Sequence, residues 1–285
     1  MAHKIVASNM TALSEAVMDY HLNHKAPDAC LNIETHLFNV TLVCGDASTF
    51  NLDVGKHLWL NRSRWSRLMK EYVPKDGLDR FIGQCCEILR GEARHGATAN
   101  MLFRDPDRYA KKHRWGGCLM GLTFRAGPKD QPPTLTMYSR TTYIGYMGFL
   151  DMAIASRICQ EITTRMGCIA LPIQFRWHLA SMQLHAFKSL PFIFSQPNLL
   201  ARLEHNAHEL NSDKPYSMPP SWMYLAKWYN KILEHYAQWG TDMLAHEKYG
   251  PFKRIKRRWL EHKRYLKKNI PPTLLVKDLD FEKCV

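Results

Sequence analysis

A cysteine, an arginine and an aspartate stand at the ends of three successive apolar segments of this 285-residue chain. Cys118 begins one strand-like segment, and Arg140 lies near the end of a second. Asp151 follows 11 residues later, at the head of an apolar, helix-like stretch. The planar guanidinium of an arginine can hold a phosphate through two hydrogen bonds. This pattern predicts an anion site at Arg140, with the hydroxyl of Thr141 beside it.

This order of cysteine, arginine and polar residue before a buried helix resembles the thymidylate synthase superfamily, and most closely its bacteriophage deoxycytidylate hydroxymethylases. The resemblance spans about residues 57–195. It implies that the Cys118 thiolate adds to carbon 6 of a pyrimidine, whose carbon 5 then attacks the one-carbon unit of 5,10-methylenetetrahydrofolate. Arg140, 22 positions later, would bind the substrate phosphate and lower the thiol pKa. Taken alone, a cysteine in an apolar strand is more often buried and inert.

Within this resemblance, the residue type at position 151 indicates which of two pyrimidine nucleotides is the substrate. Synthases that act on uracil have an asparagine at the matching position, whereas the deoxycytidylate hydroxymethylases have an aspartate. A carboxyl group suits the amino-bearing edge of cytosine, and an amide suits the acceptor and N–H of uracil. We therefore expect deoxycytidylate as the substrate. Two alternatives stay open: an acid that merely stabilises the helix N-terminus, or a methyltransferase acting on dCMP or dUMP.

The same resemblance assigns further residues to the substrate. His185 would bind a sugar hydroxyl, although Phe187 stands where the family has a tyrosine. Arg94, 24 positions before Cys118, would bind phosphate across a subunit interface, which implies a homodimer. Arg104 is the reserve candidate for that role.

Glu71 is the candidate general acid and base, because it begins the only acidic-aromatic pair in the region where the family has its catalytic glutamate. The alternative is a solvated carboxylate at a helix end. The chain also departs from the family pattern, with Gly117 for a proline, Leu119 for a histidine and Tyr143 for an aspartate. These departures fit either a remodelled enzyme or a relative that has lost folate chemistry.

The composition indicates a globular protein with an anionic partner. Hydrophobic residues make up 46% and charged residues 23%, which argues against disorder. The formal net charge of +13 favours a nucleotide, a polyanionic cofactor or nucleic acid. Eight cysteines without a CxxC pair predict reduced thiols and no structural zinc. Without a signal-like start or an apolar run of about 20 residues, we expect a cytoplasmic protein with no membrane span, in the host cytoplasm if phage-encoded.

The resemblance and the segment pattern together predict an α+β fold with a mixed or antiparallel sheet, a buried central helix and a helical C-terminal region. Alternation predicts an antiparallel hairpin from strands at 118–125 and 134–142, and a further strand at 168–175. Residues 149–162 are apolar nearly all round, as in a buried helix, and Gly167 can end it. Other patterns predict helices at 12–24, 57–72, 78–89 and 222–236 and a strand at 37–44.

The C-terminal part differs in character, so we divide the chain into a catalytic core at 1–200 and a basic helical region at 201–285 packed on it. Nine lysines and arginines and one acid, Glu261, lie between Lys253 and Lys268, with Trp259 on the apolar face. This segment could bind the glutamate tail of folate, bind nucleic acid, or remain a solvated surface. The alternative from another class is therefore a non-catalytic, nucleic-acid-binding relative of the same fold.

Overall fold

The computed structural model describes most of the chain up to residue 239. Glu71, Arg94, Arg104 and the segments 57–72 and 253–268 lie outside the described residues, so the roles assigned to them remain predictions. The described residues are 2–25, 27–31, 34–51, 75–93, 98–103, 118–128, 131–167, 171–194, 196–212 and 218–239.

Seven strands form one mixed sheet: β1 (His3–Asn9), β2 (Ala29–Leu31), β3 (Glu34–Asp46), β4 (Thr98–Leu102), β5 (Leu119–Arg125), β6 (Thr134–Tyr143) and β7 (Gln174–His185). Their order is β1-β3-β7-β6-β5-β4, and β2 pairs with β3 outside this path. β1 is parallel to β3 and β6 is parallel to β7, whereas the other pairs are antiparallel. Parallel and antiparallel pairing in one sheet agrees with the mixed sheet expected from the sequence.

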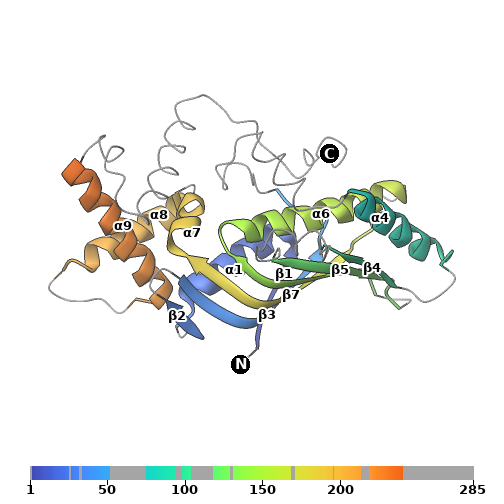
Figure 1. The fold of residues 1–285 in the computed structure, drawn as a ribbon, viewed down its shortest axis with the longest axis horizontal. Coiled ribbons are helices and arrows are strands. Elements are labelled where there is room, and N and C mark those ends of the chain that lie inside the picture. The colour runs from blue at the N-terminus through green and yellow to red at the C-terminus, as the bar shows by residue number, and fades with distance from the viewer. Residues whose placement is uncertain are drawn as a thin grey trace, which may run out of the picture.

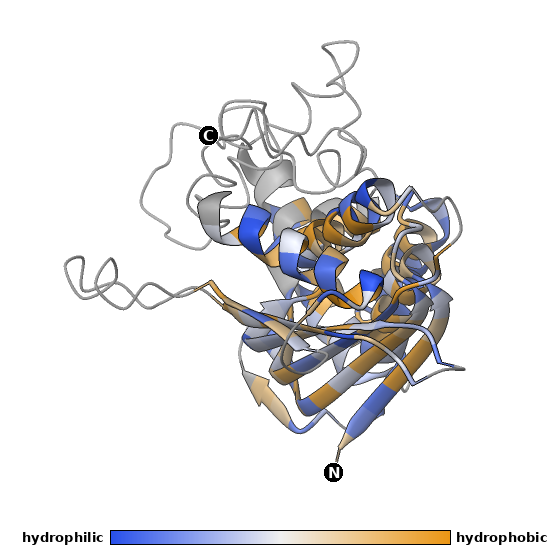
Figure 2. Cartoon of the chain, turned by 90° about the vertical axis from the view of Figure 1, so that its right-hand side faces the viewer, coloured by the Kyte–Doolittle hydropathy of each residue, from blue (hydrophilic) through white to orange (hydrophobic). Residues whose placement is uncertain are grey.

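The described helices all lie over one face of this sheet, and the other face carries none of them (Figure 1). Apolar residues of both layers gather where the helices and the sheet meet (Figure 2), and these residues form the buried core. The α+β architecture predicted from the sequence is therefore confirmed. The helices are α1 (Met10–Asn23), α4 (Lys75–Arg90), α6 (Met147–Arg165), α7 (Ala186–Phe194), α8 (Pro197–Glu209) and α9 (Pro220–Trp239).

Helix α6 is the buried helix that the sequence predicts at 149–162. Twelve of its residues are buried, and it packs against β6, α1 and α4. It ends where Gly167 takes a positive φ of 66° and donates its N–H to the carbonyl of Thr164 at 3.0 Å. This backbone conformation favours glycine, so the predicted stop at Gly167 is confirmed.

The predicted hairpin is also confirmed, since β5 and β6 pair antiparallel with Leu122 opposite Met137. The strand predicted at 168–175 is wrong in its placement. Strand β7 begins only at Gln174, and residues 171–173 lie outside it. Pro172 has no N–H to donate to a strand ladder, which explains the late start. The helices predicted at 12–24, 78–89 and 222–236 and the strand at 37–44 correspond to α1, α4, α9 and β3.

The start of α9 is joined to α1 and β3 by buried polar groups. The Oγ1 of Thr35 lies 2.9 Å from both the Oγ of Ser221 and the Nε2 of His21. Ser221 also donates to the carbonyl of His21 at 3.1 Å. Trp222, the next residue of α9, has no exposed surface. These contacts fix the C-terminal helix of the described chain on the core.

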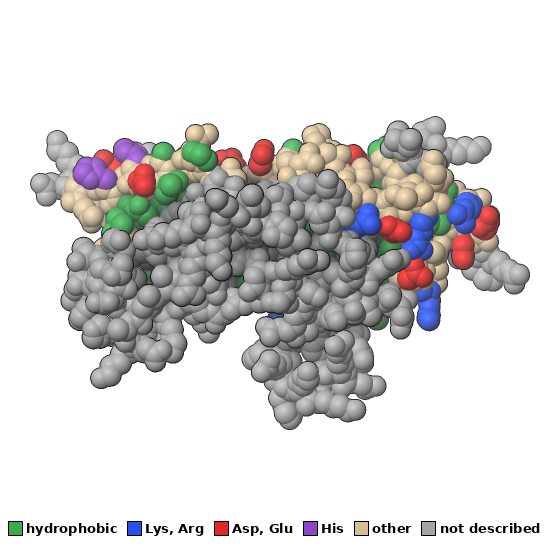
Figure 3. Space-filling model, turned by 90° about the horizontal axis from the view of Figure 1, so that it is seen from above, with side chains coloured by type: hydrophobic (Ala, Val, Ile, Leu, Met, Phe, Trp, Pro, Cys, Tyr) green, Lys and Arg blue, Asp and Glu red, His purple; other side chains and the backbone are tan. Residues whose placement is uncertain are grey.

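Charged side chains at the α4 end of the molecule are interspersed in sign (Figure 3). Arg165 lies 2.6 Å from Asp79 and 3.0 Å from Glu161, and Arg157 lies 3.4 Å from Glu161. Acidic neighbours therefore offset the positive charge of these two arginines.

We predict that His21 makes the fold less stable in acid. Burial lowers the pKa of His21 to about 3 from an ordinary value of 6.5, so the imidazole is neutral when folded but takes up a proton when unfolded. The free energy of unfolding should therefore fall as the pH drops from 6.5 towards about 3. His21→Gln keeps a donor for Thr35 but does not titrate, so chemical denaturation should show a flatter pH dependence for this variant. The control is His208→Gln at an exposed position, and equal slopes in the two variants would contradict the prediction.

Candidate active site

The pairing of the sheet is irregular at one level, and Arg140 lies at that level. The register skips Asn39 on β3, Arg140 on β6 and Ala180 on β7, which occupy matching positions on neighbouring strands. Asn39 has a positive φ of 54°, and on β5 the register shifts next to Met120. Irregular pairing of this kind bends strands and redirects side chains, and it is common beside active sites.

This irregularity decides which hydroxyl of β6 faces the helices. Before it, Ser139 points into the core, where its Oγ accepts a hydrogen bond from the Nε1 of Trp177 at 2.9 Å. After it, Thr142 takes that direction, and its Oγ1 donates to the Oδ2 of Asp151 at 3.1 Å. The Oγ1 of Thr141 is buried and has no hydrogen-bond partner among the described residues. Thr142 is therefore a contact of the Asp151 carboxylate that the sequence did not predict.

The guanidinium of Arg140 lies close enough to the thiol of Cys118 to lower the thiol pKa through its positive charge. The backbone supports this placement, because the N–H of Arg140 donates to the carbonyl of Cys118 at 2.9 Å. Asp151 lies within electrostatic reach of the same thiol. Arg140 is exposed, Cys118 is half-buried and Asp151 has no exposed surface. From Arg140 through Cys118 to Asp151, the side chains are thus increasingly buried, and Asp151 lies in the core at the start of α6.

Two glycines allow α6 to begin this close to β6. Gly145 takes a positive φ of 73° in the turn between them. A Cβ on Gly148 would lie 3.0 Å from the Oγ1 of Thr142. A side chain at Gly148 would therefore displace the hydroxyl that donates to Asp151.

The surroundings raise the pKa of the Cys118 thiol above its ordinary value. Burial is the largest cause and the charge of Asp151 the next, while Arg140 and then Lys188 act in the opposite direction. Arg140 thus lowers the thiol pKa, as the sequence predicts, but burial and the Asp151 carboxylate, which the sequence did not reveal, outweigh it. A donor bound to the Asp151 carboxylate would weaken one of the two effects that hold the thiol protonated.

A second group of polar side chains adjoins this site. Glu34, at the start of β3, pairs with His185, at the end of β7. Its Oε1 lies 3.6 Å from the Nε2 of His185 and accepts a hydrogen bond from the Oη of Tyr143 at 3.4 Å. Its Oε2 lies 3.2 Å from the Nε2 of His36. We refer to Glu34, His36, Tyr143 and His185 as the Glu34 cluster.

Tyr143 connects the Glu34 cluster to the thiol. The Nζ of Lys188 lies 3.3 Å from the centre of the Tyr143 ring, and the His185 ring meets that ring edge-on at 5.8 Å. Burial, with smaller contributions from Glu34 and Cys118, raises the pKa of Tyr143 to about 12. The phenol therefore stays protonated near neutral pH and serves as a hydrogen-bond donor.

The structure brings Cys118, Arg140 and Asp151 together and places His185 in the adjoining cluster. Sequence reasoning missed the roles of Glu34, Tyr143 and Lys188 in these contacts. No local pattern marks Glu34, because its position follows from the pairing of β3 with β7, whose contacting residues are far apart in the chain. Lys188 follows His185 by three positions, and only the turn from β7 into α7 brings it over the Tyr143 ring.

Metal binding and membrane insertion find no support in the part of the chain that the structure describes. There, no group of three or more histidine, cysteine, aspartate or glutamate side chains could hold a metal ion. No helix in the same residues is long and apolar enough to cross a membrane.

Comparison with protein-family models and with curated proteins finds no match to this chain.

We predict that two substitutions change the reactivity of Cys118 in opposite directions. Asp151→Asn removes a charge that raises the thiol pKa, so more thiolate forms near neutral pH and alkylation by iodoacetamide becomes faster. Arg140→Met removes a positive charge that lowers the pKa, so alkylation becomes slower. Each rate should change about three- to tenfold, since one pKa unit is a tenfold change in thiolate. Mass spectrometry of the Cys118 peptide measures the rates.

The exposed Cys30 in the same samples is the internal control, and its alkylation rate should be equal in all three proteins. Faster labelling of Cys118 in both variants would contradict the prediction, because it would report a loosened structure rather than altered charge.

Proposed function

We propose that this chain is a one-carbon transferase of the thymidylate synthase kind that acts on carbon 5 of a pyrimidine nucleotide. The first candidate reaction is hydroxymethylation of deoxycytidylate. The observation that supports it is the backbone hydrogen bond from Arg140 to Cys118 at 2.9 Å, which holds the guanidinium charge near the thiol, with Asp151 in electrostatic reach of the same sulfur. A nucleophile, a phosphate-binding cation and a base-recognising carboxyl group must converge for this reaction, and these residues were assigned those roles from the sequence.

Arg140 and Lys188 are the cations suited to the nucleotide phosphate. Arg140 is exposed and can present its guanidinium to an anion while its backbone stays fixed to Cys118. Lys188 lies over the Tyr143 ring, and its charge reaches the same thiol. In the proposed complex the phosphate binds at this cationic side, and His185 faces the sugar.

Asp151 is assigned to the base. Cytosine offers an amino donor beside a ring nitrogen that can be protonated, and both suit a carboxyl group. Thr142 already donates to the Oδ2 of Asp151 and orients the carboxylate. Because this carboxyl group is buried, a base that presents an acceptor to it would leave two acceptors desolvated together, which costs binding energy. This cost favours cytosine over uracil.

The cofactor of the proposed reaction, 5,10-methylenetetrahydrofolate, supplies the one-carbon unit when bound. The segment assigned to its glutamate tail, 253–268, and the candidate proton-transfer residue, Glu71, lie outside the described residues. What the described side chains contribute is the nucleophile, nucleotide binding and orientation of the base.

The direct test is turnover of labelled dCMP and dUMP with 5,10-methylenetetrahydrofolate, analysed by mass spectrometry. We expect 5-hydroxymethyl-dCMP as the product. Cys118→Ser should lower the rate at least about 10³-fold, because the nucleophile is lost. Cys30→Ser, at an exposed cysteine, is the matched control and should leave the rate unchanged.

Other products distinguish the alternatives. Methylation of dUMP would overturn the assignment of Asp151 to cytosine, whereas no product from either nucleotide would contradict the proposed function. Salt-dependent retention on DNA that survives Cys118→Ser would instead favour the nucleic-acid-binding alternative.

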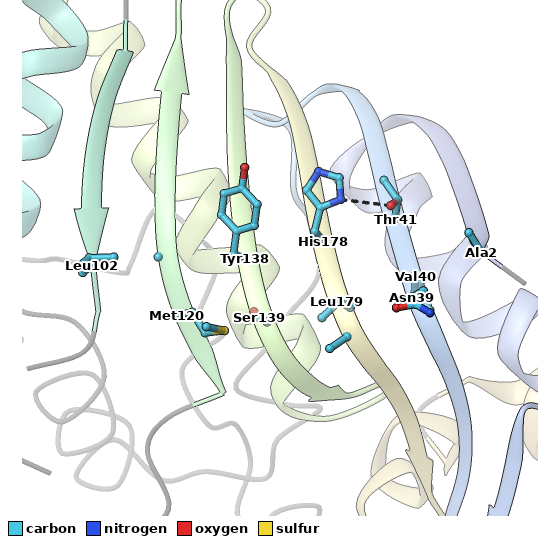
Figure 4. A pocket seen from close by; sticks show the side chains of 12 residues that line it. Ala2, Asn39, Val40, Thr41, Leu102, Met120, Tyr138, Ser139, His178 and Leu179 are labelled. Atoms are coloured by element: carbon cyan, nitrogen blue, oxygen red, sulfur yellow. Dashed lines mark hydrogen bonds between the residues drawn. The ribbon is translucent and has the colours of Figure 1, made fainter. Parts of the chain in front are cut away.

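The open face of the sheet supports the homodimer that the resemblance implies. Its strands expose apolar side chains, among them Phe38, Met120, Tyr138 and Leu102, at 39 to 76% of their surface. Met120, Tyr138 and Leu102 line a groove of about 920 Å³ in which the rings of Tyr138 and His178 stack, 5.5 Å apart (Figure 4). Contiguous apolar surface of this kind is typical of protein interfaces. We propose that two copies pack through this face.

We predict that Tyr138→Glu dissociates the dimer, because it places a charge at the centre of the apolar face. Light scattering coupled to size exclusion should give twice the chain mass for the native protein and a single chain mass for the variant. Leu233→Glu, at an equally exposed apolar residue of α9, is the control and should remain dimeric. A native protein of single chain mass would contradict the proposed dimer.

A further inference from the structure

The Glu34 cluster combines a carboxylate with a tyrosine and two histidines, and this arrangement suits a hydroxyl group. Tyr143 stays protonated and donates to Glu34, while His36 approaches the Oε2 of this carboxylate and His185 its Oε1. A sugar hydroxyl brings both a proton to donate and lone pairs to accept. The carboxylate of Glu34 is the charged acceptor of the cluster and therefore the strongest acceptor for that proton.

The contacts of Glu34 leave room for such a partner. They measure 3.2 Å to His36, 3.4 Å to Tyr143 and 3.6 Å to His185, all longer than the 2.5–2.9 Å or so of strong charge-assisted hydrogen bonds. A carboxylate has about four acceptor sites, so the three long contacts that Glu34 makes with described residues do not saturate it. Its side chain is 17% exposed, so it is largely desolvated but still reachable.

Charge fixes which end of a nucleotide approaches the cluster. Lys188 lies over the Tyr143 ring, and its charge and that of Arg140 both act on the Cys118 thiol, so phosphate is attracted to these two cations. The negative charge of Glu34 repels phosphate. The sugar, uncharged and rich in hydroxyl groups, is the part of the substrate that this carboxylate can bind.

We propose that Glu34 accepts a hydrogen bond from the 3′-hydroxyl of the nucleotide sugar and determines selectivity for that hydroxyl. Phe187, which has no hydroxyl, stands where the resembling enzymes have their second sugar-binding residue, and Glu34 reaches the sugar site from a different strand. This assignment rests on the proposed function, because it requires a nucleotide bound between Arg140 and His185.

The test compares the affinity of the full chain for dCMP and for 2′,3′-dideoxycytidine monophosphate, measured by titration calorimetry. The native protein should bind dCMP at least about tenfold more tightly, as expected for a hydrogen bond to a charged acceptor. Glu34→Ala should bring the ratio to within about threefold by weakening dCMP alone. Glu34→Gln keeps a neutral acceptor and should give an intermediate ratio. If Glu34 were only structural, its loss would weaken both ligands equally and preserve the ratio, which would overturn the assignment.

Glu204→Gln is the matched control, because Glu204 also accepts a hydrogen bond from a tyrosine, Tyr229 at 3.2 Å, but on an exposed helical surface. This variant should keep the native ratio. The ratio in the native protein is decisive even if the Glu34 variants do not fold. Equal affinity for the two ligands, in a protein that turns over dCMP, would overturn the role of Glu34 and leave the proposed function standing. Binding of neither ligand, without turnover, would contradict the proposed function itself.

Discussion

The backbone hydrogen bond from Arg140 to Cys118 joins the two strands of a hairpin at the point where the sheet meets the head of α6. It holds the Arg140 charge near the Cys118 thiol, while the irregular pairing beside Arg140 directs its side chain. The position of Asp151 depends on the same place, because α6 starts directly after β6 and its first turn approaches Thr142. One local constraint thus brings three groups of different chemistry together.

Burial and opposing charges at this point set the pKa of the Cys118 thiol above its ordinary value. Burial and Asp151 favour the protonated thiol, and Arg140 and Lys188 favour the thiolate. Such balanced, partly desolvated charges are more common at functional sites than in ordinary cores. They also explain how a substrate could activate its own nucleophile, since a base that hydrogen-bonds the carboxylate shifts the balance towards the thiolate.

Local patterns predicted the parts of the fold that positions close in sequence specify. Alternation marked the β5–β6 hairpin, and a run of apolar residues marked α6, because each pattern follows directly from burial. The short strands β1, β2 and β4 gave no such signal, and the start of β7 was misplaced across Pro172. Local patterns could not predict contacts that depend on pairing between distant segments. One such contact is that of Glu34 with His185. Another is that of Thr142 with Asp151, because the irregular pairing of β6 with β7 turns Thr142, and not Thr141, towards α6.

The central claim is that Cys118 is a nucleophile towards carbon 6 of a pyrimidine nucleotide. The most direct measurement is the intact mass of the protein after incubation with 5-fluoro-dCMP and 5,10-methylenetetrahydrofolate. Fluorine replaces the proton that carbon 5 must lose after it attacks the one-carbon unit, so the covalent adduct is trapped. Our account predicts a mass increase that maps to the Cys118 peptide and disappears in Cys118→Ser. An unchanged mass with both 5-fluoro-dCMP and 5-fluoro-dUMP, or an adduct on a different cysteine, would contradict it.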